Sequence, residues 1–412
     1  MRWDKNIQAF FELVKAGLFP EREVQEFKSS MVQGVQEFKD VDWGEVQRLA
    51  EEQSVVGLVA AGIERVQEFK GSRVQGVQAS TGSATGSRFK VPKPVTLQFI
   101  GQTLQLEERN KSMNEYLAWL IERLREEDIY AILVKGQGIA QCYERPLWRA
   151  SGDIDLLLSE VNYEKAKKVL VPLAIDVERE FVALKHLGMT MPGGIVVELH
   201  GMMHSRLSKR VDRVIDEAQK RVFFGGNVRS WVVQGSRGSK VQGVQVFLPA
   251  PNEDVIFVFT HILHHYYIEG VGLRQICDWC RLLWTYRDAL DYGLLEKWIR
   301  EAGLMSEWKA FAALAVQYLG MPEEAMPMIG SSVQEFKSKA DRIMEFVIES
   351  GNFGHNRADE RSHSRFPLIR KIHAAWLKTS DFIRHARVFP WDSVKFFFHF
   401  VCDGVGLAAE KK

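Results

Sequence analysis

The fold of this chain is decided by the stretch Leu133-Val134-Lys135-Gly136-Gln137-Gly138, followed by Trp148-Arg149-Ala150-Ser151-Gly152-Asp153-Ile154-Asp155-Leu156-Leu157-Leu158. The apolar run 129–134 ends at a Lys-Gly pair, which is typical of a buried strand that runs into a turn. A second apolar run covers 153–158 and starts with Asp-Ile-Asp. We therefore predict two strands joined by a glycine turn and a short helix over 138–143.

The second predicted strand begins with a pair of acids. Strand alternation places Asp153 and Asp155 on one face, roughly 6.6 Å apart from the rise per residue. At an effective dielectric of about 20, two such charges repel by roughly 2.5 kcal/mol, which a cation between them would remove. Oxygen ligands without His or Cys alongside favour Mg²⁺, and two ions about 3.5–4 Å apart suit phosphoryl-type transfer. Taken alone, an Asp-x-Asp pair is more often a solvated strand end.

A third acid is expected from a neighbouring strand, about 4.8 Å away. Glu198 meets this expectation because it lies in Val196-Val197-Glu198-Leu199, flanked by strand-forming apolar residues. It would either bind metal or take the proton of an attacking hydroxyl, and the sequence leaves both roles open. The plainer alternative is a glutamate exposed on the polar face of its strand.

The glycine turn predicts a place for an anion. Gly136 and Gly138 follow a strand and precede a helix, where the backbone can approach a phosphate and the helix N-terminus favours negative charge. Lys135 and Arg149 would add positive charge beside that anion.

The remaining pattern predicts an α+β protein with an α/β core. Strands are expected at 181–191 and 194–200 and a helix at 163–170, which together give a small mixed sheet covered by helices. Helical periodicity precedes and follows this region, with a helix starting near Asp42, one over 96–128, one from Asn252 to 267, and others over 273–286, 294–302 and 307–319. We predict an N-terminal helical region 1–112, a central domain 113–250 that holds the sheet, and a C-terminal helical domain 251–412.

Composition excludes several classes of protein. The chain has 412 residues and a net charge of +1, from 54 Lys+Arg and 53 Asp+Glu, so no basic excess indicates nucleic-acid binding. Four cysteines are too few for a disulfide framework, which favours a reducing cytoplasm. The N-terminus has no signal-peptide pattern and no apolar run is long enough to span a bilayer, so we expect a cytoplasmic protein without a membrane partner. The oligomeric state is left open.

Two short strings recur irregularly along the chain. Val-Gln-Glu-Phe-Lys starts at Val24, Val35, Val66 and Val333, and Val-Gln-Gly-Val-Gln starts at Val32, Val74 and Val241. The spacing excludes a solenoid, whose period would be fixed. The copies lie between predicted elements, so our hypothesis is in-frame insertion at loops, where insertions cost little. A repeated docking motif is the alternative.

Two further groups of residues have competing interpretations. Cys277-x-x-Cys280 has the spacing of a metal or redox pair, but it lies inside a helical pattern without a second pair, so we expect core packing. His261 and His265 lie four residues apart and share a helix face, which predicts either a place in the substrate cleft or burial. The pattern is not that of a zinc protease, since Ile262 follows His261.

Together these motifs resemble the uncharacterised bacterial nucleotidyltransferases of the DNA polymerase beta-like superfamily. Those proteins show a strand ending in Lys-Gly, then Arg-x-x-x-Asp-h-Asp, where h is apolar, then an h-Glu-Leu-His strand. Here the matching residues are Lys135-Gly136, Arg149 with Asp153-Ile154-Asp155, and Val197-Glu198-Leu199-His200. The family's further spaced residues would match His186, His261, His265, Arg274 and Asp278. This chain departs from the superfamily at Gln137, where a second Gly or a Ser is usual, and in its long gap from Gly136 to Asp153.

The resemblance implies transfer of a nucleoside monophosphate from an NTP to an acceptor hydroxyl, with Mg²⁺ as cofactor. Asp153, Asp155 and Glu198 would be the catalytic and metal-binding residues, while Lys135, Gly136, Gly138 and Arg149 would bind phosphate. His186, His200, His261 and His265 would line the cleft. The acceptor stays open between a small molecule, an RNA end and a protein. Two alternatives remain: a catalytically silent relative that binds nucleotide or protein, and a helical interaction protein whose acids are incidental.

Overall fold

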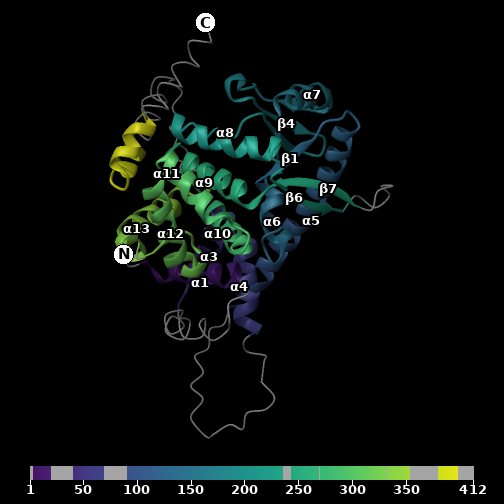
Figure 1. The fold of residues 1–412 in the computed structure, drawn as a ribbon. Coiled ribbons are helices and arrows are strands. Elements are labelled where there is room, and N and C mark those ends of the chain that lie inside the picture. Colours follow the sequence, from purple (N-terminus) through teal and green to yellow (C-terminus); the bar gives the residue numbers. More distant parts are fainter. Residues whose placement is uncertain are drawn as a thin grey trace, which may run out of the picture.

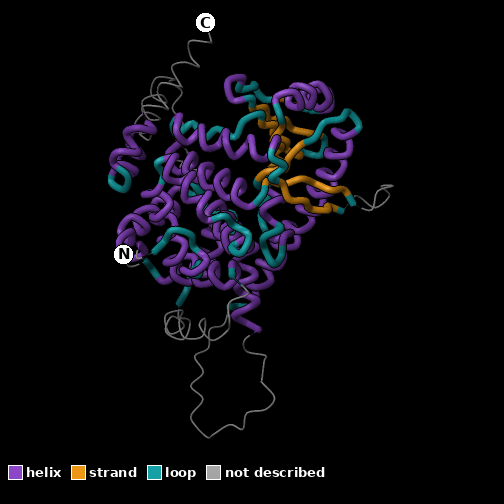
Figure 2. Tube along the Cα trace, in the orientation of Figure 1, coloured by secondary structure: helices purple, strands orange, loops and turns teal. Residues whose placement is uncertain are grey.

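The structure of the chain is a computed structural model that describes residues 3–19, 40–68, 91–234, 243–268, 270–330, 332–352 and 379–397. Helices surround one mixed sheet, which lies to the right in Figure 1 and is coloured orange in Figure 2. The predicted α+β class is confirmed.

The N-terminal part consists of helices. They are α1 (Lys5–Leu18), α3 (Trp43–Glu52), α4 (Val56–Glu68) and α5 (Lys93–Arg125). Asp4 and Asp42 cap the first two, because each carboxylate accepts hydrogen bonds from two backbone amides of the first turn. The predicted start near Asp42 is confirmed. The helix α5 runs without interruption across the predicted domain boundary between residues 112 and 113.

The sheet has the strand order β3-β4-β5-β2-β1-β7-β6. Its strands are β1 (Ala131–Val134), β2 (Asp153–Leu158), β3 (Asp176–Val177), β4 (His186–Met191), β5 (Ile195–His200), β6 (Val228–Val233) and β7 (Val244–Pro249). The pairs β2–β5 and β1–β7 are parallel, and the other neighbours are antiparallel. The parallel pairs bring together segments that lie far apart in the sequence.

Helices connect the strands. They are α6 (Gly136–Ala140), η2 (Pro146–Trp148), α7 (Glu160–Leu170), η3 (Val171–Leu173), η4 (Val182–Leu184) and α8 (Lys209–Phe224). After β7 the chain continues as α9 (Pro251–Ile268), α10 (Leu273–Tyr286), α11 (Tyr292–Ala302), α12 (Met305–Leu319), η5 (Glu323–Ala325) and α13 (Ser332–Ser350). Residues 379–386 and 390–397 are also helical.

Each face of the sheet has its own apolar core. One core holds Ile154, Leu156 and Leu158 of β2 together with buried side chains of α5 and α7. The other, larger core takes Leu157 of β2 and joins it to the N-terminal and C-terminal helices. Because alternate residues of β2 enter different cores, the face that carries Asp153 and Asp155 is the one next to the larger, helical core.

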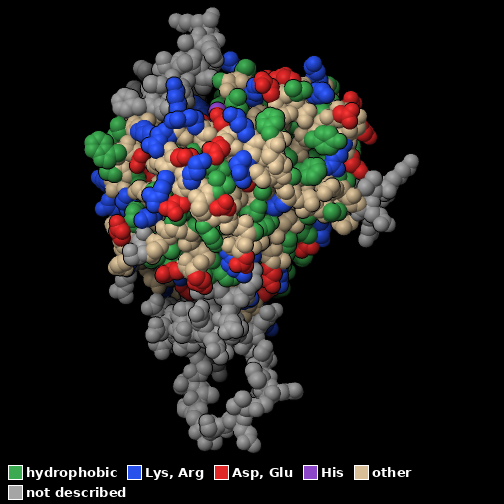
Figure 3. Space-filling model, viewed as in Figure 1, with side chains coloured by type: hydrophobic (Ala, Val, Ile, Leu, Met, Phe, Trp, Pro, Cys, Tyr) green, Lys and Arg blue, Asp and Glu red, His purple; other side chains and the backbone are tan. Residues whose placement is uncertain are grey.

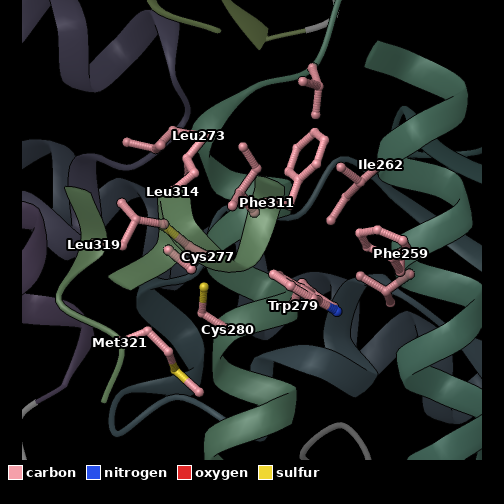
Figure 4. Packing of buried hydrophobic residues seen from close by; sticks show 14 of the residues in the cluster. Phe259, Ile262, Leu273, Cys277, Trp279, Cys280, Phe311, Leu314, Leu319 and Met321 are labelled. Carbon is pink, nitrogen blue, oxygen red and sulfur yellow. The ribbon is translucent and has the colours of Figure 1, made fainter. Parts of the chain in front are cut away.

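The cysteine pair lies in the larger core. Cys277 and Cys280 are free and fully buried on α10, beside Phe311, Leu314 and Met321 (Figure 4). Burial in these apolar surroundings raises the pKa of Cys277 well above its usual value. The prediction that the pair packs in the core is confirmed.

Several predicted elements differ from the structure. The strand expected over 181–191 begins only at His186, because Val182–Leu184 form the 3₁₀ helix η4 and Lys185 is left-handed. The helix predicted to start at Asn252 begins one residue earlier, at Pro251. The helix α8 and the strands β3, β6 and β7 were not predicted.

The repeat copies that lie in the described residues do not all fall in loops. The copy at Val333 lies within α13, the described part of the copy at Val66 ends α4, and the described part of the copy at Val241 leads into β7. For these copies the expectation of loop positions is wrong. The remaining copies, at Val24, Val32, Val35 and Val74, lie outside the described residues.

The visible face in Figure 3 carries Lys and Arg interspersed with Asp and Glu. This agrees with the near-zero net charge of the sequence. Among the described residues, none of the helices combines the length and the apolar character needed to cross a bilayer.

Candidate active site

Three carboxylates converge from two neighbouring strands. The strand β2 carries Asp153 and Asp155, and the parallel strand β5 places Glu198 directly opposite Asp155. One oxygen from each of the three side chains lies within 4.8 Å of the others. The structure therefore brings together the acids that the sequence singled out, at a spacing that suits a shared cation.

Lys135 lies at the end of β1, whose last residue Val134 pairs with Asp155. Its Nζ donates to Asp155 Oδ1 at 3.0 Å. Burial opposes the charged amine, but Asp155, Glu198 and Asp153 outweigh it and raise the pKa of Lys135. Its backbone has φ +56° and ψ −147°, a conformation that costs a non-glycine residue about 1–3 kcal/mol. Such strain persists where the surroundings require it, here at the turn that leads to the site.

Two histidines complete the group. His200 Nε2 lies 2.8 Å from Asp155 Oδ1 and 3.4 Å from Glu198 Oε2. His186, which pairs with His200 across β4 and β5, places its Nε2 3.1 Å from Glu198 Oε2. The two rings contact each other with centroids 4.8 Å apart. The sequence predicts that both histidines line the cleft, and the structure places them against the carboxylates.

The charges at the site are unevenly balanced. The nearby charge of Asp155, together with burial and Glu198, raises the pKa of Asp153 to about 6. The pKa of Asp155 is lowered, because Lys135 and the hydrogen bond from His200 outweigh its burial. The pKa of Glu198 is lowered as well, since hydrogen bonds from His186 and His200 outweigh burial. The charges of Asp155 and Glu198 therefore repel a negative charge on Asp153, and a bound cation would offset this repulsion.

Arg149 points to a carboxylate on another element. Its guanidinium makes two hydrogen bonds to Asp278 of α10, at 3.1 and 2.5 Å, and a third to Ser151. Tyr143 donates to the same carboxylate at 2.8 Å. The side chains of Arg149 and Asp278 are only 6% and 3% exposed. Arg274 of α10 donates to the Ala150 carbonyl at 2.7 Å, so two contacts from α10 hold the segment that leads into Asp153.

Gly136 and Gly138 of the turn are constrained to glycine by different features, one by backbone conformation and the other by packing. Gly136 has φ +41°, which side chains rarely adopt. Gly138 lies so close to Leu248 that an added Cβ would stand 2.7 Å from its Cδ2. Between them, Gln137 is buried and neither atom of its amide has a hydrogen-bond partner among the described residues. Gly138 therefore serves the packing of α6 against β7, while Gly136 shapes the turn.

His261 and His265 of α9 contact each other, with their Nε2 atoms 3.1 Å apart. Burial, followed by the charge of Lys135, lowers the pKa of His261 well below its usual value. The charge of Lys135 and, more weakly, that of His200 contribute to this lowering. His265 lies deeper, at 8% exposure.

Sequence reasoning missed two contacts of the site. The salt bridge from Lys135 to Asp155 was predictable from the sequence, because Lys135 directly follows the strand that pairs with β2. The contact of His186 with Glu198 was not predictable, because the start of β4 was misplaced.

The comparisons with known proteins agree with this geometry. A family model described as "Uncharacterised nucleotidyltransferase" matches residues 39–320, which is more than half of the chain and includes every residue of the site. A search of curated proteins and a search of solved structures found no match. The chain therefore belongs to this family of uncharacterised nucleotidyltransferases.

Proposed function

We propose that this protein transfers a nucleoside monophosphate from an NTP to an acceptor hydroxyl, with Mg²⁺ as cofactor. The observation that carries the proposal is the convergence of Asp153, Asp155 and Glu198 within 4.8 Å on adjacent strands. The family supports an NTP as the donor substrate.

The donor set fits a hard divalent cation. All three acids offer carboxylate oxygens, which Mg²⁺ prefers, and the raised pKa of Asp153 reports repulsion that a cation would relieve. Asp153, Asp155 and Glu198 would hold the ion. When bound, Mg²⁺ would neutralise charge that develops on the phosphoryl oxygens.

The side chains of the protein would orient the reaction. The acceptor oxygen forms a bond to the α-phosphorus as the bond from that phosphorus to the bridging oxygen of the β-phosphate breaks. Pyrophosphate leaves, and the hydroxyl proton passes to solvent water. Lys135 supplies positive charge beside Asp155, where the phosphates would lie. Glu198, whose pKa is lowered by two histidines, is a better ligand than base.

The structure supports a positioning role for Arg149 in place of the predicted phosphate contact. Its charge is already matched by Asp278, inside the protein. Through Asp278 and Arg274, the helix α10 instead fixes the residues just before Asp153.

The test is transfer of label from [α-³²P]NTPs, each supplied with Mg²⁺ and a lysate of the source organism. We expect one or more NTPs to label an acceptor and to release pyrophosphate only when Mg²⁺ is present. Asp153→Asn and Glu198→Gln should each lower the rate by about 100-fold or more, because each replaces a charged carboxylate ligand by a neutral amide. Asp288→Asn, at a side chain 90% exposed and outside the site, is the matched control and should keep the wild-type rate.

Two results would contradict the proposal. Absence of both label and pyrophosphate, while NTP with Mg²⁺ still raises the melting temperature, would identify a silent nucleotide-binding relative. Absence of any effect of NTP on the melting temperature would favour an interaction protein.

A further inference from the structure

A second group of ligand atoms adjoins the three acids. Glu198 Oε2 faces the Nε2 atoms of both His186 and His200, and one ligand atom from each of the three residues lies within 4.8 Å of the others. Glu198 belongs both to this group and to the group of three acids. The two groups therefore lie side by side and share one carboxylate.

The distances suit ligands of a single ion. Metal–nitrogen and metal–oxygen bonds of about 2.0–2.2 Å place neighbouring ligand atoms roughly 3.0 Å apart in octahedral geometry and roughly 3.4 Å apart in tetrahedral geometry. The measured separations from Glu198 Oε2 are 3.1 Å to His186 Nε2 and 3.4 Å to His200 Nε2. Both values fall in that range, so the imidazoles need little movement to share an ion with Glu198.

The donor set also indicates which ion. Two imidazole nitrogens with one carboxylate oxygen favour first-row transition metals such as Zn²⁺, Co²⁺ or Fe²⁺, whereas Mg²⁺ prefers oxygen alone. The side chains of His186 and Glu198 are 24% and 27% exposed, so an ion can reach them from solvent.

We propose that His186, His200 and Glu198 form a transition-metal site beside the three acids, with Glu198 as the ligand common to both. The ligand geometry alone supports the site. Its role, as the second ion of a pair about 3.5–4 Å apart that acts on the transferred phosphate, rests on the proposed function. The competing explanation is that the histidines only hold the carboxylates in place by hydrogen bonds, His186 at Glu198 and His200 at Asp155 and Glu198.

The first experiment measures metal affinity without nucleotide, by titration calorimetry with Zn²⁺ and separately with Mg²⁺. We expect His186→Gln to weaken Zn²⁺ binding by at least about 10-fold, the lower end of what losing even a supporting partner of a metal site costs. Mg²⁺ binding should change less than about twofold, because the three acids are intact.

The matched control is His204→Gln. His204 also pairs with a carboxylate, Asp216, at 2.7 Å and is 22% exposed, but it lies outside the site. This variant should bind Zn²⁺ as tightly as the wild type. Equal loss in both variants would mean adsorption to surface histidines and would overturn the proposal.

The second experiment identifies the ligands directly. Co²⁺ bound through Nε2 shifts the exchangeable Nδ1 proton of each imidazole far outside the normal proton spectrum. We expect two such signals from the wild type and from His204→Gln, and only one from His186→Gln and from His200→Gln. No shifted signal in the wild type, or unchanged Zn²⁺ affinity in His186→Gln, would show that the histidines only hold the carboxylates in place. Neither measurement needs NTP turnover, so failure of the proposed function would be seen separately.

Discussion

Arg149 forms its closest contacts with a carboxylate that lies 129 residues further along the chain. The pair with Asp278 is bidentate and almost fully buried. Removing one partner of such a pair leaves an uncompensated buried charge, which costs about 3–5 kcal/mol, whereas replacing both by apolar residues is often close to neutral. The pair therefore allows the structural and the phosphate-binding roles of Arg149 to be separated.

We predict that Arg149→Met and Asp278→Leu each lower the free energy of unfolding by about 3–5 kcal/mol, and that the double variant recovers most of the loss. Urea unfolding of the four proteins measures this coupling. If Arg149 only positions the segment before Asp153, the KM for NTP of the refolded double variant stays within a few-fold of wild type. A large rise in the KM for NTP in the double variant would show that Arg149 binds phosphate.

The residues of the candidate site differ in how far sequence could predict them. The shared face of Asp153 and Asp155 follows from alternation within one strand. The place of Glu198 follows once its strand is assumed to pair with theirs. The partner of Arg149 could not be predicted from these patterns, because its contact depends on how α10 packs against the loop before β2. Local sequence patterns therefore predict which carboxylates could bind a cation. Which charged groups already form an ion pair, as Arg149 does with Asp278, depends on tertiary packing.

At the scale of elements, the helices α1 and α4 pack so closely that their backbones are in contact. An added Cβ on Gly17 of α1 would stand 2.1 Å from the Leu58 carbonyl oxygen of α4, and one on Gly62 of α4 would stand 2.1 Å from the Leu13 carbonyl oxygen of α1. Neither helix can accept a side chain at these positions without moving away from the other.

We predict that Gly62→Ala lowers the free energy of unfolding by about 1–3 kcal/mol, despite the better helix propensity of alanine. Gly101→Ala is the matched control, because Gly101 lies within α5 and nothing is found within 4 Å of its added Cβ. That variant should be stabilised by about 0.5–1 kcal/mol. Chemical unfolding of both variants tests the contact, and stabilisation of Gly62→Ala would refute it.

The elements that were not predicted differ in how clearly the local sequence indicates them. The helix α8 carries its buried residues Val211, Val214, Ile215 and Ala218 at helical spacing, so the sequence does contain a signal for this helix. The strand β7 is held by parallel pairing with β1, more than a hundred residues earlier. Pairing over that distance follows from the whole sheet and not from the six residues of the strand.

At the scale of the molecule, both ends of the described chain enter one core. Trp3 and Phe11 contact Tyr318 of α12, with ring centroids 6.1 and 5.3 Å apart. Side chains from the predicted first and third domains thus pack in the same core, which also covers the carboxylate face of the sheet. The predicted division into 1–112, 113–250 and 251–412 remains a prediction.

This shared core contains a titratable group whose protonation should control global stability. Glu307 of α12 is fully buried, and burial, with a smaller effect of Asp392, raises its pKa to about 8. Tyr267 of α9 donates to its Oε1 at 3.1 Å, while its Oε2 has no partner among the described residues. The folded protein therefore holds a proton that an unfolded chain, with a glutamate pKa of about 4.3, releases.

The sign of the pH dependence follows from that difference. Between about pH 4.3 and pH 8 the native state binds more protons at Glu307 than the unfolded state, so the free energy of unfolding falls as pH rises and levels off above about pH 8. We predict that Glu307→Gln, which keeps an acceptor for Tyr267, matches the wild type near pH 4 and exceeds it by several kcal/mol near pH 8.5. Glu324→Gln, at an exposed site after α12, is the matched control and should follow the wild-type curve. Urea unfolding across this range is the measurement, and parallel curves for wild type and Glu307→Gln would show that Glu307 is ionised in the core at neutral pH.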